Sequence, residues 1–144
     1  MADGKSKNRI GKSLNIMAKK GVLLVNLGTP DSAEVKDVRK YLDQFLMDER
    51  VIDIPKFKRA LLVKGIIVPF RSPKTSKLYK EIWSENGSPL LHYSKIQAKL
   101  LQEKLGDDYQ VELAMRYQNP SIGSGLENLR NNNCNKIIAY ILCK

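Results

Sequence analysis

Short apolar runs alternate along this chain with longer segments of helical periodicity. Residues 21–27 form the first run, rich in leucine and valine, as in a strand buried within a parallel sheet. Apolar residues then recur at helical spacing over residues 35–46. Residues 109–117 and 136–142 indicate two further strands. The alternation predicts an α/β fold, an open parallel sheet with helices on both faces.

The chain between the first two predicted strands indicates several helices. Residues 57–70 are apolar and predicted to be helical, and residues 71–75 (Arg-Ser-Pro-Lys-Thr) predict a turn before a helix at 74–83. A later helix is expected to end at Gly106. A short helix is predicted after Pro120.

The composition is that of an ordinary soluble protein. The chain has 144 residues, of which 42% are hydrophobic and 28% charged. No apolar run approaches the roughly 18 residues of a membrane span, and the start lacks the apolar region of a signal peptide. We therefore expect a cytoplasmic protein. Cys134 and Cys143 form neither a CxxC pair nor a disulfide framework, which favours reduced structural thiols.

Half of the formal net charge of +10 lies in the first 20 residues, which carry six lysines or arginines and one aspartate. Such a segment can bind nucleic acid or anionic lipid, but its polar composition favours a solvated tail. We expect residues 1–18 to be a basic, disordered leader, of which residues 1–16 are dispensable, and residues 19–144 to form the domain. Met17 is an alternative start. A nucleic-acid partner is not expected, because basic and aromatic residues are not interleaved.

Ligands of open parallel sheets bind beyond the carboxyl ends of the strands. That rule selects residues 26–30 and 116–120, and Gly28 in the first of these allows close backbone approach. Asp31 or Ser32 is expected to cap the following helix. Nucleotide binding is weakly supported, because the sequence has no G-x-G-x-x-G or GxxxxGK[ST] phosphate motif.

Among the charged residues near these ends, Arg116 is either an anion clamp or an ion-paired arginine, with equal support. His92, the only histidine, has no Cys or His neighbours that would indicate a metal site. Asp48 and Glu49 are interpreted as turn charges. Residues 57–70 are either a core helix or an exposed lip that touches a membrane or holds an apolar ligand.

Five short strings resemble the ferrochelatase family in order and spacing. They are Val25-Asn-Leu-Gly-Thr-Pro30, Phe45-Leu-Met-Asp-Glu-Arg50, Arg71-Ser-Pro-Lys74 with Tyr79, Gly87-Ser-Pro-Leu90, and Met115-Arg-Tyr117 with Asn119-Pro-Ser-Ile122. The resemblance covers residues 18–138. It implies the first half of a fold made of two similar α/β halves, with a porphyrin cleft between them and the second domain absent from this chain.

The resemblance also implies roles for individual residues. The implied porphyrin-binding residues are Leu27 beneath the ring, Arg71, Tyr79, Ser88 and Arg116. The family position of Leu27 is often Met or Tyr, so leucine offers no metal ligand there. Many bacterial members have glycine where this chain has Gln118. The His and Glu that take up pyrrole protons belong to later segments of the family, so no catalytic residue is expected before Lys144.

The implied activity is that of a lyase which inserts ferrous iron into protoporphyrin IX to form protohaem in haem biosynthesis. Iron is then a substrate, and no cofactor or metal site is expected. The expected partners are porphyrin, ferrous iron and, weakly, a membrane surface that a cytoplasmic protein touches peripherally. Beyond residue 138 the sequence of this chain departs from the pattern of the family. This departure predicts a truncated, frameshifted or partial chain without activity of its own. The alternative is a non-catalytic module that binds porphyrin or haem.

Overall fold

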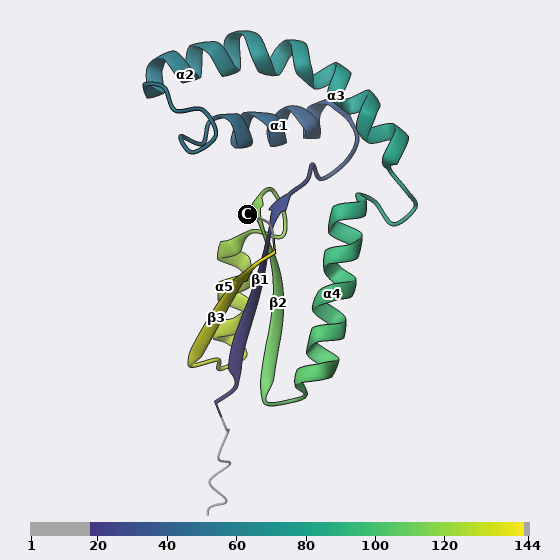
Figure 1. Ribbon diagram of the computed structural model, residues 1–144, viewed down its shortest axis with the longest axis vertical. Helices are drawn as coiled ribbons and strands as arrows, with labels where there is room; N and C mark the ends of the chain where they lie inside the picture. The colour runs from purple at the N-terminus through teal and green to yellow at the C-terminus, as the bar shows by residue number, and fades with distance from the viewer. Residues whose placement is uncertain (1–17, 143–144) are drawn as a thin grey trace, which may run out of the picture.

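A computed structural model describes residues 18–142 of the chain. The predicted leader, apart from Ala18, and Cys143 therefore lie outside the described residues. The described part has a sheet with a helix on each side, and a layer of further helices stands beyond one end of the sheet (Figure 1). The carboxyl ends of the strands lie where these two parts meet.

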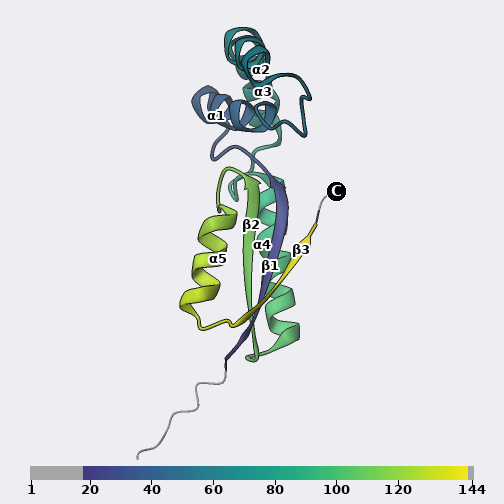
Figure 2. The ribbon, with the colours of Figure 1, turned by 90° about the vertical axis from the view of Figure 1, so that its left-hand side faces the viewer.

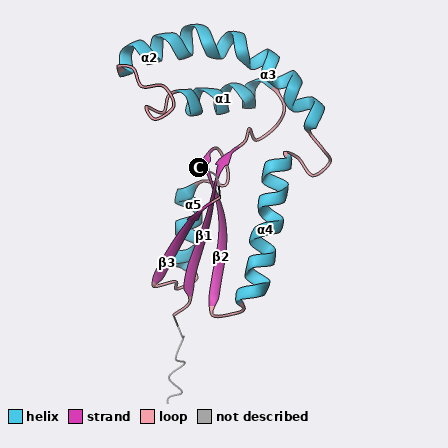
Figure 3. Cartoon of the chain, viewed as in Figure 1, coloured by secondary structure: helices cyan, strands magenta, loops and turns pink. Residues whose placement is uncertain are grey.

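The sheet is parallel, as the sequence predicted. Its strands are β1 (Lys20–Gly28), β2 (Tyr109–Tyr117) and β3 (Lys136–Ile141). Their order is β2-β1-β3, which places the continuous apolar run of β1 in the middle (Figure 3). Both pairings are parallel, and Val22 lies opposite Val111 on one side and Ile138 on the other.

Helices cover both faces of the sheet, which confirms the predicted α/β class. Figure 2 shows α4 (Pro89–Leu105) and α5 (Ile122–Asn131) on opposite sides. Leu23 of β1 is buried in a cluster with Leu129 of α5, whereas Leu24 faces a groove beside Leu101 of α4. The helix α4 ends at Gly106, whose φ of 73° is in the left-handed region that favours glycine, as expected from the sequence.

The strand β3 is the least covered element. It pairs with β1 alone, and every one of its residues is exposed. Ile138 is 54% exposed and Tyr140 is 61% exposed, and both line an apolar groove of about 420 Å³ between β3 and α4. The other edge of β3 has no paired strand among the described residues.

The helical layer consists of α1 (Val35–Leu46) and one continuous helical run that crosses it. That run is α2 (Lys56–Leu62), the π-helical turn η1 (Val63–Ile67) and α3 (Val68–Ile82). The helices α1 and α3 enclose a core that contains Val38, Leu42, Leu46, Val63 and Val68. The predicted helices at residues 35–46 and 57–70 are thus confirmed.

The π turn explains why two valines five positions apart are both buried. In an α-helix, side chains at positions i and i+5 are about 140° apart and face different directions. Here the N–H of Val68 donates to the carbonyl of Val63, the wider hydrogen bond of a π turn. Val63 and Val68 are therefore both in the core, and the face that α3 presents is set by this turn.

The predicted turn at residues 71–75 is wrong, because α3 continues through Pro73. A proline inside a helix removes one backbone hydrogen bond, and tertiary packing compensates for this loss. Ser72 and Ser76, on either side of Pro73, are both buried. The hydroxyl of Ser76 donates to the carbonyl of Ala33 at 2.6 Å, a partner 43 residues away that local sequence does not reveal.

The predicted cap of α1 is also corrected. The N-cap residue is Glu34, without a side-chain cap hydrogen bond, and not Asp31 or Ser32. Ser32 instead accepts a hydrogen bond from the backbone N–H of Glu34 at 3.2 Å and donates to the carboxylate of Asp37. Ser32 thus stabilises the segment that leads into α1, two residues before the N-cap.

Candidate functional site

The two strand ends selected from the sequence lie next to each other. Gly28 at the end of β1 pairs with Tyr117 at the end of β2. Its φ is 119°, and a Cβ atom at this position would lie 2.1 Å from the carbonyl oxygen of Tyr117. Only glycine permits this approach, so Gly28 lets residues 26–30 and 116–120 lie side by side.

A cavity of about 590 Å³ opens beside the end of β2. The residues around it come from the last turn of α1 and the turn that follows it, the π turn, the end of β2 and the start of α5. They include Asp43, Gln44, Asp48, Lys64, Arg116 and Tyr117. Arg116 is the one predicted site residue in this lining.

Arg116 is held by a network with Asp48 and Tyr117. Its Nη2 donates to Oδ2 of Asp48 at 2.6 Å, and its Nε donates to the hydroxyl of Tyr117 at 3.1 Å. That hydroxyl donates in turn to Oδ2 of Asp48 at 2.9 Å. The backbone N–H of Arg50 donates to Oδ1 of the same carboxylate at 2.9 Å. The ion-paired interpretation of Arg116 therefore describes its contacts in this structure.

These hydrogen bonds keep Asp48 and Arg116 charged. Donation from Arg116, followed by Arg50 and Tyr117, holds the pKa of Asp48 far below its usual range. The hydrogen bond to Asp48 raises the pKa of Arg116 above its usual value. Asp48 is thus poorly suited to accept a proton at neutral pH.

Leu27, at the end of β1, and Tyr79, on α3, pack against the same apolar cluster, the core of the helical layer. Both are partly buried. The ring of Tyr79 meets that of Tyr41 edge-on, with centroids 6.5 Å apart. Burial raises the pKa of Tyr79, and it raises the pKa of Tyr41 to about 12, so both phenols are neutral at ordinary pH. The result is an apolar and aromatic wall.

Ser88 lies inside the structure, at the N-cap of α4, and is 2% exposed. The hydroxyl of Thr29 donates to its Oγ at 2.9 Å. Nearby, the side-chain amide of Asn26 donates to the hydroxyl of Ser94 at 3.0 Å. These hydrogen bonds attach the start of α4 to the end of β1, so the Ser88 hydroxyl has an internal partner.

Arg71 and His92 are set apart from the cavity lining. Arg71 is exposed on α3. His92 lies partly buried in the first turn of α4, with its ring centroid 5.3 Å from that of Tyr93. The structure therefore groups the predicted residues as Leu27 with Tyr79 on one wall and Arg116 in the polar cavity. It does not bring Arg71 or Ser88 to that cavity.

Gln44 is a site residue that sequence reasoning missed. Its Oε1 accepts from the backbone N–H of Gln118 at 2.9 Å and from the side-chain amide of Gln118 at 2.6 Å. Asp48 and Lys64 were also missed as cavity residues. The partners of all three residues lie on β2 or on another helix, many positions away, so no local spacing in the sequence marks the pairs.

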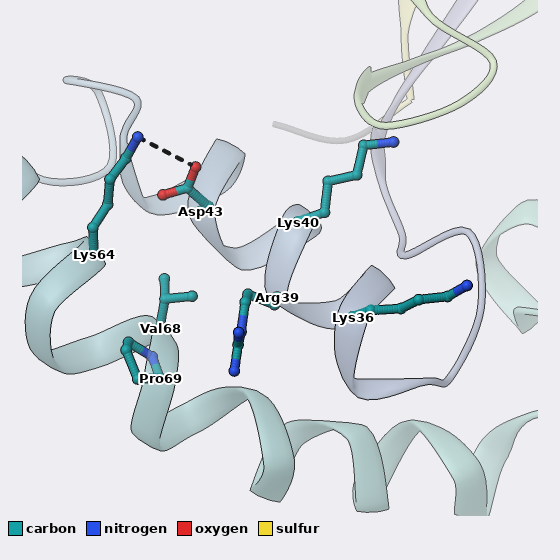
Figure 4. A pocket seen from close by; sticks show the side chains of 7 residues that line it. All are labelled: Lys36, Arg39, Lys40, Asp43, Lys64, Val68 and Pro69. Carbon is teal, nitrogen blue, oxygen red and sulfur yellow. Dashed lines mark ion pairs between the residues drawn. The ribbon is translucent and has the colours of Figure 1, made fainter.

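A second cavity of about 320 Å³ lies between α1 and the start of α3 (Figure 4). Its charged lining residues are Lys36, Arg39, Lys40, Asp43 and Lys64. The cations point apart, and Lys64 and Lys40 lie 3.8 Å and 3.5 Å from the carboxylates of Asp43 and Asp31. Their divergence gives no common point at which an anion would be held.

Among residues 18–142, no three side chains of the His, Cys, Asp or Glu type come together as a protein metal site would require. None of the helices in the same range is long and apolar enough to cross a membrane.

Comparison with known proteins identifies the family. The family model described as Ferrochelatase matches residues 19–143. A ferrochelatase of Legionella pneumophila (strain Paris) is 49% identical over 112 residues, which cover 78% of this chain and 34% of the relative. A ferrochelatase of Coxiella burnetii (strain RSA 493 / Nine Mile phase I) is 49% identical over 122 residues, which cover 85% and 34%. The chain spans about a third of the length of these relatives, and it belongs to the ferrochelatase family.

Proposed function

We propose that this chain supplies one wall of a porphyrin site in an enzyme that inserts ferrous iron into protoporphyrin IX, a lyase reaction of haem biosynthesis. The observation that carries the proposal is the apolar and aromatic wall of Leu27 and Tyr79 at the end of the sheet that also bears Arg116. A porphyrin is a flat apolar ring with acidic groups on its edge. Apolar packing for the ring and a cation for the edge are the contacts that it needs.

The residues have distinct roles in this proposal. Leu27 packs beneath the ring and offers no metal ligand, and Tyr79 packs as a neutral phenol. Arg116 and the exposed Arg71 bind carboxylates. Ser88, which the resemblance implies as a porphyrin-binding residue, has in this proposal the role of holding the start of α4 against the end of β1 through its hydrogen bond with Thr29.

Metallation requires that the ring bend, that two pyrrole protons leave and that iron enter. Binding energy bends the ring toward the transition state. Iron is a substrate, and the proton acceptors are expected outside residues 18–142. Asp48 does not fill this role, because its pKa is held too low. We therefore expect the 144-residue chain alone to bind porphyrin weakly and to show no appreciable turnover.

An anaerobic insertion assay with zinc or ferrous iron and mesoporphyrin IX tests this proposal. Binding is followed by fluorescence quenching, and turnover by absorbance beside a control without protein. We expect saturable binding that weakens in Arg116→Ala, with insertion at the background rate. Absence of binding in a folded sample would contradict the proposed function. Robust turnover that disappears in Arg116→Ala would instead contradict the expected inactivity.

A peripheral membrane contact by a cytoplasmic protein is part of the same proposal. Large apolar side chains on the run from α2 to α3 are exposed, namely Phe57 (82%), Leu61 (66%), Ile66 (55%) and Phe70 (72%). Lysines at positions 56 and 58 flank Phe57. An apolar ridge with neighbouring cations favours weak binding to an anionic bilayer surface.

A further inference from the structure

We propose that Asp48 is a positioning residue that orients the guanidinium of Arg116 for an acidic ligand in the adjoining cavity. The proposal rests on the proposed function, since it names how that site would receive the carboxylate edge of a porphyrin. The two residues are far apart in the sequence. Asp48 follows α1, whereas Arg116 lies near the end of β2.

The contacts fix Arg116 at two points. Asp48 accepts from Nη2 at 2.6 Å, and the Tyr117 hydroxyl accepts from Nε at 3.1 Å while donating to the same Asp48 oxygen. The carboxylate is itself anchored by the backbone N–H of Arg50, and its side chain is only 15% exposed. A closed triangle of this kind restricts the rotation of an otherwise flexible side chain.

The same contacts leave Arg116 able to bind a ligand. A guanidinium carries five N–H donors. Two of its nitrogens, Nε and Nη2, have partners, and within residues 18–142 Nη1 has no hydrogen-bond partner. The side chain of Arg116 is 37% exposed beside the cavity. An ordered guanidinium with free donors can bind a carboxylate without first being immobilised.

The competing account is that Asp48 masks Arg116 by neutralising it. The two accounts predict opposite results when Asp48 is replaced. Loss of a positioning contact weakens the binding of an acidic ligand, because the ligand must then order the arginine itself. Loss of a mask strengthens that binding, because a repelling carboxylate is gone.

The experiment compares the 144-residue chain with Asp48→Ala, Asp48→Asn and Glu49→Gln, using mesoporphyrin IX and its dimethyl ester as probes. Glu49→Gln is the matched control, since it removes the same charge from an exposed neighbour that has no ion pair or hydrogen bond among the described side chains. We expect the Kd for mesoporphyrin IX to rise about tenfold in both Asp48 variants. The Kd for the ester and all values for Glu49→Gln should stay unchanged. An unchanged or lower Kd for mesoporphyrin IX in the Asp48 variants would overturn the proposal.

A second readout needs no porphyrin. Hydrogen exchange of the Arg116 Nε–H, followed by NMR, should be slow in the native chain and in Glu49→Gln, and fast in the Asp48 variants. Backbone spectra verify that each variant is folded, and Asp48→Asn keeps the side-chain shape if Asp48→Ala does not fold. Equal exchange in all variants would refute positioning. Slow native exchange without any porphyrin binding would refute the proposed function while leaving the positioning role intact.

Discussion

Gln118 adopts a φ of 65°, a left-handed conformation that costs a residue with a side chain about 1–3 kcal/mol. It is nonetheless buried, with 7% of its surface exposed. Gln44 compensates for this strain, because its Oε1 accepts hydrogen bonds from both the backbone N–H and the side-chain amide of Gln118. The glycine that the family resemblance leads one to expect at this position would avoid the strain, but it would leave Gln44 with one donor fewer. Positions 44 and 118 therefore act as a pair.

The buried phenol of Tyr41 predicts a loss of stability in alkali. Burial, followed by the neighbouring Tyr79, raises its pKa in the folded chain to about 12, whereas an unfolded tyrosine ionises near 10. Below pH 10 the phenol is neutral in both states, so it adds no pH dependence. As the pH rises from 10 toward 12, ionisation favours the unfolded chain.

We therefore expect the free energy of unfolding to fall more steeply over this range in the native chain than in Tyr41→Phe. Urea unfolding at a series of pH values from 8 to 11.5 measures both slopes. Parallel curves for the two proteins would show that the phenol is not buried as described.

At the scale of elements, periodicity in the sequence predicted the strands and most helices correctly, because their apolar faces are local patterns. The turn at residues 71–75 was mispredicted because Pro73 is a strong local signal, and the packing of Ser76 against Ala33 overrides it. The cavity was predicted only at Arg116, as its partner Asp48 lies 68 positions away. Contacts between distant elements are what the sequence alone could not provide.

The exposed ridge of α2, η1 and α3 predicts weak membrane binding. The native chain should float with anionic liposomes at low salt, and Phe57→Ser/Phe70→Ser should float less, because it loses two of the exposed apolar side chains. Both positions are exposed, so the melting temperature should change little.

Leu100→Ser is the matched control, since Leu100 is 58% exposed on α4, away from the ridge. Equal flotation of the native chain and the double variant, or loss of flotation in the control, would argue against the ridge as the binding surface.

Across the whole molecule, the described residues form two separate cores. One lies between α5 and the sheet, around Leu23 and Leu129. The other lies in the helical layer, around Val38 and Val63, and Tyr117 at the end of β2 belongs to it. The candidate site stands at the boundary between these cores, where Figure 1 shows the helical layer above the strand ends. Small movements of one core relative to the other would therefore change the site first.

The open edge of β3 predicts that the protein associates at high concentration. An exposed apolar strand with an unpaired edge is a template for pairing with other chains. Ile138→Lys/Tyr140→Lys should lower light scattering during concentration, because it places charges on the exposed side of this strand. Tyr93→Lys/Leu100→Lys is the control, because it adds the same two charges at exposed positions of α4. Scattering that falls equally in both variants would reflect net charge and not the strand edge.

The π turn makes this stretch tolerant of a change in chain length that an ordinary helix would not bear. Five positions separate Val63 from Val68, and the wider turn is what lets both be buried. Loss of one residue there, such as Gly65, would leave the two valines four positions apart, and residues at i and i+4 of an α-helix lie on the same face, about 40° apart. Both valines would then stay in the core, and α3 would keep the face that it presents. The same loss in a regular α-helix would instead turn everything after it by about 100°.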